Sequence, residues 1–318
     1  MFTLQDGYYK YRSMYLGLKE LNPAGGIFAN AHHPVHGWNL VKPKASPQLK
    51  VLLQDDLTFS ADNKCVEIEN YLEYYKENIK YVQFYTWHYG LGEIYPKLNI
   101  FYYPFFFYEY LNCVKDHKIV SMFNFLKKTK KFLCLNGNRR SHRQIVVDRI
   151  KNKKNCFWSY RSKNIGNIPN EMFTKEDYYN AKNAFQANVY NLISCKELYN
   201  HTCFSLVTET RYKLPLDFVT EKTLQCILAL HPALYVSNRY HVKHLRDNGF
   251  DVFDDIFDHS YDCLDDDNRI TKLLNDNMNV LDQGISINDN IKARLLVNRD
   301  HLLGNFHHKI FKTIEKVP

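Results

Sequence analysis

The sequence predicts a protein of two α/β lobes that face a central cleft. Three observations lead to this fold class. The chain has 318 residues, which is long for one hydrophobic core and comfortable for two. Strand-like runs alternate with helical patterns in both halves, and a basic run, "KKTKK" at 127–131, stands between them. Such alternation favours mainly parallel sheets with helices on both faces.

The first half predicts an N-terminal domain over residues 1–130. Its first strand is "KVLLQDD" at 50–56, and "IENYLEYYKENI" at 68–79 follows as a helix. Two further strand-like runs are "KYVQFYTW" at 80–87 and "NIFYYP" at 99–104. This order is typical of a parallel α/β sheet.

The second half predicts another α/β domain over residues 131–285, followed by a helical segment at 286–318. By analogy with other two-lobed α/β enzymes, this last helix is expected to pack back on the first lobe, with a bend at Gly304. The expected strands are 132–136, 156–160, 203–209, 233–236 and 250–253, and the expected helices are 141–151, 175–199, 220–230 and 240–247. Ligands of such sheets lie at the carboxyl ends of the strands.

Composition predicts an ordinary globular protein of a reducing compartment. Hydrophobic residues make up 45% of the chain and charged residues 24%. The eight cysteines are widely spaced, with no C-x-x-C pair, which favours free thiols over disulfides or zinc. The start "MFTLQDGYYKYR" has no signal-peptide pattern, and the most apolar stretch, "NIFYYPFFFYEYL", is too short to cross a bilayer. We therefore expect a cytoplasmic protein without a membrane span.

Charge is distributed unevenly. The net charge is +8, yet residues 127–163 hold thirteen Lys/Arg and one acid, and residues 251–267 hold eight Asp and no Lys/Arg. The basic segment suggests an anionic partner, although a solvated basic face explains it too.

One candidate phosphate site follows the strand at 132–136. Asn138 lies in the turn, and Ser141 with Gln144 three residues later is a capping-box pattern for a helix start. Free N–H groups at such a start, with Arg140 and Arg143 beside them, favour a phosphate. The alternative is a turn followed by a solvated basic helix.

A second candidate site repeats this arrangement. The strand at 203–209 ends at Glu209, and Thr220 is placed to cap a helix whose first residues are Glu221 and Lys222. The helix dipole favours Glu221 at this place but disfavours Lys222 unless an anion lies nearby. A carboxylate for a ribose and a lysine for a diphosphate together indicate a nucleotide-sugar pocket.

These residues resemble a known family. The run "TEKTLQCILALHPALYV", preceded by "FSLVTET" and followed by "LRDNGFDVF" and "DHSYD", is similar to the donor-binding domain of the fucosyltransferase-like GT-B glycosyltransferases, including viral and phage relatives. In that family T-E-K opens the helix that holds the nucleotide, and an upstream N-x-R-x-x-R-like segment supplies an arginine to the diphosphate. The resemblance covers roughly residues 132–280, and the first half resembles no acceptor domain of the family.

Carried to this chain, the resemblance implies specific roles. Glu221 would bind the ribose, and Lys222 with Arg140 or Arg143 would hold the diphosphate. Glu209 would contact the nucleotide or the transferred sugar.

The acidic stretch near residue 262 has two interpretations. "SYDCLDD" matches a segment near the end of the resembling domain, which implies that Tyr261 and Asp262 line the edge of the cleft. "DDD" at 265–267 has the D-x-D spacing of metal-dependent glycosyltransferases, but its place before "NRITKLL" favours the acidic start of a helix.

The catalytic base is expected on the first lobe. Transfer to a hydroxyl needs a carboxylate or histidine to remove the proton. Asp55 and Asp56 end the first predicted strand and are the leading candidates, although ordinary strand-end acids would look the same. Further candidates are Glu93, His88 and the cluster His32, His33 and His36, for which a metal or an acceptor loop are alternatives.

The resulting hypothesis is a metal-independent glycosyltransferase that uses a nucleotide-diphosphate sugar and no other cofactor. Phage relatives suggest a hydroxymethylated base in DNA as acceptor, flipped out of the duplex, in the cytoplasm of a host cell. A glycan or lipopolysaccharide acceptor is an alternative. A non-catalytic nucleic-acid-binding protein is the second alternative, supported by the basic segment.

Overall fold

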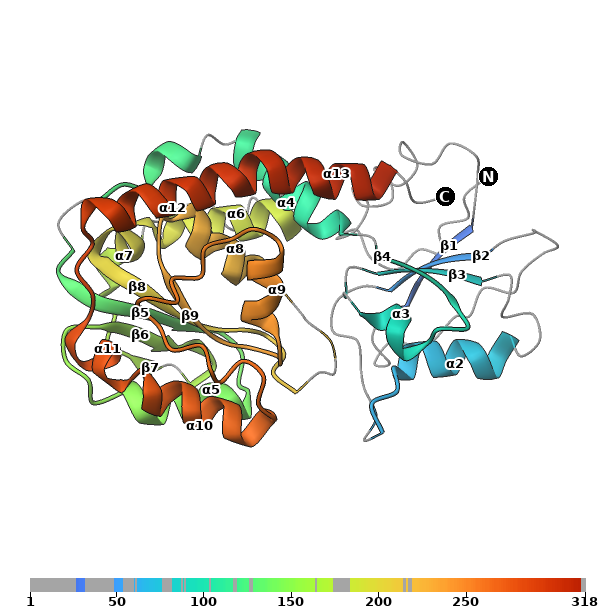
Figure 1. The fold of residues 1–318 in the computed structure, drawn as a ribbon, viewed down its shortest axis with the longest axis horizontal. Helices are drawn as coiled ribbons and strands as arrows, with labels where there is room; N and C mark the ends of the chain where they lie inside the picture. Colours follow the sequence, from blue (N-terminus) through green and yellow to red (C-terminus); the bar gives the residue numbers. More distant parts are fainter. Residues whose placement is uncertain are drawn as a thin grey trace. The chain divides into compact units, whose positions relative to one another are not determined.

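The fold is described from a computed structural model that shows a mixed α/β protein (Figure 1). No helix in the described part of the chain is long and apolar enough to cross a membrane. The described residues are 27–31, 49–53, 60, 62–75, 82–86, 88, 90–102, 104–116, 119–125, 128–163, 165–173, 184–213, 216 and 219–315.

The chain divides into two compact units. Unit 1 comprises Met1–Tyr108, Leu214–Leu216 and Lys309–Pro318, and unit 2 comprises Glu109–Lys213 and Asp217–His308. The division at Tyr108 differs from the predicted domain boundary at 130/131. Residues 109–130 are grouped with the second sheet in this division.

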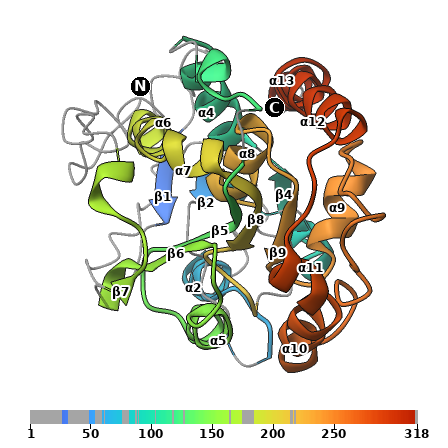
Figure 2. The same cartoon turned by 90° about the vertical axis from the view of Figure 1, so that its left-hand side faces the viewer.

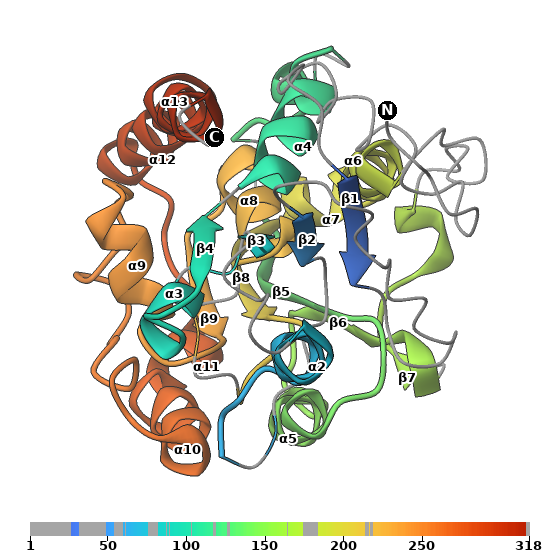
Figure 3. The same cartoon turned by 90° about the vertical axis from the view of Figure 1, so that its right-hand side faces the viewer.

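Unit 1 contains a four-stranded parallel sheet in the order β1-β2-β3-β4 (Figure 3). The three strands expected from the sequence are present, and β1 is an addition. Their bounds are β1 Ile27–Ala31, β2 Leu49–Leu53, β3 Val82–Thr86 and β4 Asn99–Tyr102. The parallel sheet agrees with the strand-helix alternation of the first half.

Helices α2 (Val66–Tyr75) and α3 (Leu91–Ile94) of unit 1 are joined through one tyrosine. The hydroxyl of Tyr95 accepts a 2.7 Å hydrogen bond from the N–H of Cys65 and donates one of 3.0 Å to Glu69. This buried bond network fixes the start of α2 beside the end of α3.

Unit 2 contains a five-stranded sheet in the order β7-β6-β5-β8-β9. The strands β6, β5, β8 and β9 are parallel, and only the short edge strand β7 is antiparallel. The bounds are β5 Lys130–Asn136, β6 Phe157–Tyr160, β7 Ile165–Gly166, β8 Thr202–Thr208 and β9 Ala233–Val236. β7 was not expected from the sequence, because two residues give no periodic pattern.

The strand order creates a topological switch between β5 and β8. From β5 the chain first adds β6 on one side, and later it returns to add β8 and β9 on the other side. The connections from these two central strands therefore diverge at the carboxyl edge. Ligands of open α/β sheets bind at such a switch point.

Helices cover both faces of this sheet (Figure 1). Helix α5 lies on one face, and α6, α7 and α8 lie on the other. The bounds are α5 Ser141–Ile150, α6 Ala184–Ser194, α7 Lys196–His201, α8 Glu221–Leu228, α9 His241–Asp247, α10 Asp266–Asp276 and α11 Met278–Gln283. Burial of β8 and β9 between helices explains why both strands read as nearly continuous apolar runs.

The strand expected at 250–253 does not form. Phe253 has a φ of 62°, in the left-handed region, and the N–H of Phe253 donates a 2.8 Å hydrogen bond to the carboxylate of Asp251. This local side-chain bond replaces the sheet ladder.

The C-terminal helical segment contains a π-helical turn. Helix α12 (Asp289–His301) continues through a π-helical turn, Leu302–Phe306, into α13 (His307–Glu315). Gly304 lies in that turn. Within unit 1, the ring of Phe311 in α13 stacks on Tyr108 of α4 (Phe105–Asp116) at 5.6 Å.

Candidate functional site

The main candidate site is a pocket of about 620 Å³ at the switch point of unit 2. Gly137 after β5 and Thr208 at the end of β8 line it, together with Glu221 and Lys222 in the first turn of α8. Because the pocket also reaches the face covered by α6 and α8, it combines polar groups at the strand ends with an apolar interior. This is the arrangement expected of a small-molecule site.

Thr220 caps α8, as the sequence predicted. Its backbone is extended, and its hydroxyl accepts a hydrogen bond from the N–H of Lys222. Glu209 completes this helix start from the end of β8. Its fully buried carboxylate accepts hydrogen bonds from the hydroxyl and N–H of Thr220 and, at 2.7 Å, from the hydroxyl of Thr223. Glu209 therefore holds α8 against β8, and it does not line the pocket.

Groups within the protein offset the unfavourable interaction between the Lys222 ammonium and the dipole of α8. Its ammonium donates hydrogen bonds to Glu221 at 2.9 Å, to Thr210 at 3.0 Å and to Thr220 at 3.3 Å. The sequence analysis expected an anion beside Lys222, and the carboxylate of Glu221 is such an anion. A bound diphosphate is therefore not needed to explain a lysine at this position.

The Glu221–Lys222 pair is ionised in the folded protein. Burial opposes the charge of Glu221, but the Lys222 ammonium and a backbone N–H outweigh it, so the pKa of Glu221 lies below its usual value. Burial likewise opposes the charge of Lys222, and the carboxylates of Glu221 and Glu209 outweigh it and raise its pKa. The pocket thus presents one fixed positive and one fixed negative group side by side.

Arg143 is a structural clamp in this protein. Its buried guanidinium donates to the carbonyl of Asn138 at 2.9 Å and to those of Thr208 and Glu209 at 3.3 Å each. It therefore ties the turn after β5 to the end of β8. Asn138 contributes its carbonyl to this clamp, and its side chain is exposed.

Arg140 sits at the start of α5 without the predicted capping box. It occupies the cap position with no side-chain cap bond, and Gln144 bonds to Asp148 instead. The backbone of Arg140 is held by the hydroxyl of Tyr160. Among the described residues that line the pocket, neither Arg140 nor Arg143 appears. Arg143 lies close enough to Glu221 for its guanidinium to contribute to lowering the pKa of that carboxyl, although it does not line the pocket.

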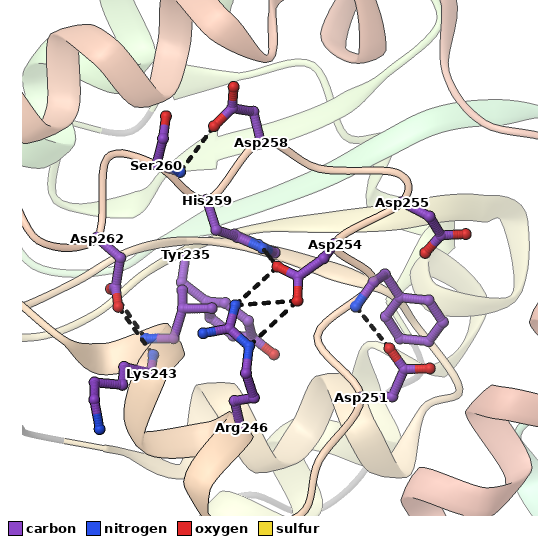
Figure 4. A network of polar contacts seen from close by, with 12 residues as sticks. Tyr235, Lys243, Arg246, Asp251, Asp254, Asp255, Asp258, His259, Ser260 and Asp262 are labelled. Carbon is purple, nitrogen blue, oxygen red and sulfur yellow. Dashed lines mark hydrogen bonds and ion pairs between the residues drawn. The ribbon is translucent and has the colours of Figure 1, made fainter.

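Tyr261 lies in the core of unit 2, whereas the resemblance implied a position at the edge of the cleft. It is 1% exposed, and its hydroxyl accepts a hydrogen bond from the N–H of Tyr235 in β9. Asp262 accepts from the N–H groups of Val242 and Lys243 and so caps α9 (Figure 4). Both side chains are engaged in holding the loop to β9 and α9.

Several aspartates of the acidic segment 251–267 form ion pairs or hydrogen bonds within the fold (Figure 4). Arg246 forms a two-pronged ion pair with Asp254, which also accepts from His259 at 2.9 Å. Asp251 and Asp255 hold Arg294. The triplet 265–267 starts α10, as the sequence favoured.

Arg269 organises the loops at the carboxyl edge and was missed by sequence analysis. Its guanidinium is buried, donates to the carbonyls of Ser237, Tyr212 and Leu264, and pairs with Asp266 at 2.8 Å. A helical position among acids looks like an ordinary exposed arginine in the sequence, and nothing in the pattern indicates its burial.

The basic segment 127–163 does not form one uniform face. Several of its cations bond within unit 2: Arg149 to Asn275, Lys151 to Asp148, and Lys153 to Asp282. Arg161 is exposed and lines the pocket of Lys222. It is the cation that the sequence analysis did not single out, because it lies in no recognisable motif.

Only two of the candidate bases, Glu93 and His88, lie among the described residues. Asp55, Asp56, His32, His33 and His36 lie outside the described residues. Glu93 is exposed and His88 is buried. No group of three or more metal-ligating side chains occurs among the residues that the structure describes.

Comparison of the chain with protein-family models, with curated proteins and with solved structures gave no match.

Proposed function

We propose that this protein is a glycosyltransferase that binds a nucleotide-diphosphate sugar in the pocket at the switch point of unit 2. The observation that carries the proposal is the position of Glu221 and Lys222, at the first turn of α8, on the wall of this pocket. The resemblance of "TEKTLQCILALHPALYV" to the donor-binding helix of the fucosyltransferase-like GT-B enzymes supports it.

In this proposal Glu221 binds the ribose hydroxyls and Lys222 binds the diphosphate. Arg161, on the same pocket, takes the second phosphate contact that the resemblance assigned to Arg140 or Arg143. Two cations can stabilise the charge that develops on the leaving diphosphate, so the reaction needs no metal. Glu209, Thr220 and Arg143 position these groups through α8 and the end of β8.

The acceptor in the proposal is a hydroxyl group. Asp55 or Asp56, which follow β2 in the sequence, serves as the base that removes its proton. A hydroxymethylated DNA base and a glycan are the two acceptor classes, and transfer assays with each separate them.

A thermal-shift screen tests the donor site without knowledge of the acceptor. The protein is heated with UDP, GDP and their sugars, with and without EDTA. A ligand at 100 times its Kd stabilises the native state by about 2.7 kcal/mol, roughly 5–10 °C for a domain of about 200 residues. We expect one base to produce such a shift, undiminished by EDTA. No shift with any nucleotide, together with salt-sensitive DNA binding, would instead favour the non-catalytic nucleic-acid-binding protein.

A further inference from the structure

A second pocket, of about 610 Å³, lies at the opposite edge of unit 2, where β5 and β8 begin. Lys128, two residues before β5, and Cys203, at the start of β8, line it from the sheet side. The segment 283–287 and Lys292 of α12 line it from the other side. Helix α11, which precedes this segment, contacts β5, and Figure 2 shows α11 next to α10.

Two lysines and no carboxylate line this pocket among the described residues. Lys292 forms a 2.8 Å ion pair with Asp289, whose side chain is 98% exposed, and pairs of that kind contribute little. The described lining of the pocket therefore carries a net positive charge, and Asp289, which pairs with Lys292, lies outside it. Such a lining favours a ligand that carries an anionic group.

Lys128 is only partly satisfied in this pocket. Its ammonium donates to the carbonyl of Tyr199 at 3.1 Å, and that same carbonyl also accepts from the buried ring of His231 at 2.6 Å. No carboxylate of the described residues pairs with Lys128, and a half-buried ammonium in such surroundings is disfavoured relative to the neutral amine. Lys128 is therefore suited to act as a nucleophile.

The pKa shifts of Lys128 and of two nearby groups, Cys203 and His231, agree with a nucleophilic role of Lys128. Burial lowers the pKa of Lys128 to about 8. Near neutral pH a much larger fraction of such amines is neutral than of an ordinary lysine. Burial raises the pKa of Cys203 despite the nearby Lys128 and the N–H of Ile285, so the thiol stays protonated. Burial lowers the pKa of His231 to about 3, so this ring stays neutral.

We propose that the pocket at the amino edge of β5 and β8 binds a small anionic carbonyl compound, with its anionic group against Lys292 and its carbonyl carbon beside Lys128. The neutral Lys128 nitrogen adds to the carbonyl carbon to give a carbinolamine. Loss of one water then leaves an imine. The step consumes no oxidant and no reductant. It is independent of the proposed donor site, whose Lys222 is held charged by Glu221.

Pyridoxal 5′-phosphate, an anionic aldehyde, is a suitable probe. The full-length protein is incubated with it, reduced with borohydride, digested and mapped by mass spectrometry. We expect Lys128 to be modified at least tenfold faster than the exposed Lys154, and the rate to rise with pH and level off above about 8. Lys292→Gln should slow modification of Lys128 by pyridoxal 5′-phosphate but not by pyridoxal, which lacks the phosphate.

Two results would overturn the proposal. One is modification of Lys128 at the rate of Lys154, and the other is an equal effect of Lys292→Gln on both aldehydes. Lys128→Arg, which keeps the charge, should remove the fast-reacting site. If that variant does not fold, the wild-type map and its pH profile still decide between the outcomes.

Discussion

Replacing Glu209 with alanine is expected to lower the free energy of unfolding by about 3–5 kcal/mol, the usual cost of breaking a buried charge network. The change removes the carboxylate that accepts hydrogen bonds from the hydroxyl and N–H of Thr220 and from the hydroxyl of Thr223. It also removes a negative charge that supports Lys222. Urea unfolding followed by circular dichroism measures the loss.

Matched variants separate the charge from the shape of Glu209. Glu209→Gln keeps the size and one acceptor oxygen, so its loss should lie between those of the wild type and Glu209→Ala. Glu171→Gln, at an exposed position, should change stability by less than about 0.5 kcal/mol. A loss below about 1 kcal/mol in Glu209→Ala would show that this carboxylate does not hold α8 in place.

Replacing Lys222 with methionine is expected to weaken binding of the nucleotide-diphosphate sugar by roughly 10- to 150-fold. The loss corresponds to about 1.5–3 kcal/mol, the range for a hydrogen bond to a charged group. Methionine keeps most of the length of the side chain and removes the ammonium from the pocket wall. Isothermal titration calorimetry with the nucleotide found in the screen measures the change in Kd.

The controls for Lys222 come from the same chain. Lys154→Met removes an exposed cation remote from the pocket lining and should leave the Kd unchanged. Arg161→Gln should weaken binding because Arg161 lines the same pocket. An unchanged Kd in Lys222→Met would contradict the assignment of the diphosphate to this residue.

The periodic parts of the fold could be predicted from the sequence. The strands of unit 2 around β5 and β8 are apolar runs bounded by turns, and the helix start at Thr220 follows from its side-chain chemistry. The run at 250–253 has the same apolar pattern, yet it forms no strand. Its backbone is turned by the bond between Asp251 and the N–H of Phe253, which a pattern of side-chain polarity does not reveal.

Part of the candidate site could also be predicted from the sequence. The sequence brought Glu221 and Lys222 to one helix turn, and the structure gives both a place on a pocket wall. It could not show that Glu209 and Arg143 bond internally, because burial depends on contacts between distant segments such as β8 and α5. Arg161 was overlooked because its position in the pocket depends on the path of the chain after β6.

Photocrosslinking with a nucleotide-sugar analogue that carries an azide on the base tests the donor site most directly. The label is mapped by peptide mass spectrometry, with and without an excess of the unmodified nucleotide sugar. The account predicts protected labelling on peptides that line the switch-point pocket, those containing Gly137, Arg161 or Glu221. Labelling elsewhere on the chain, or labelling that the unmodified nucleotide sugar does not reduce, would contradict it.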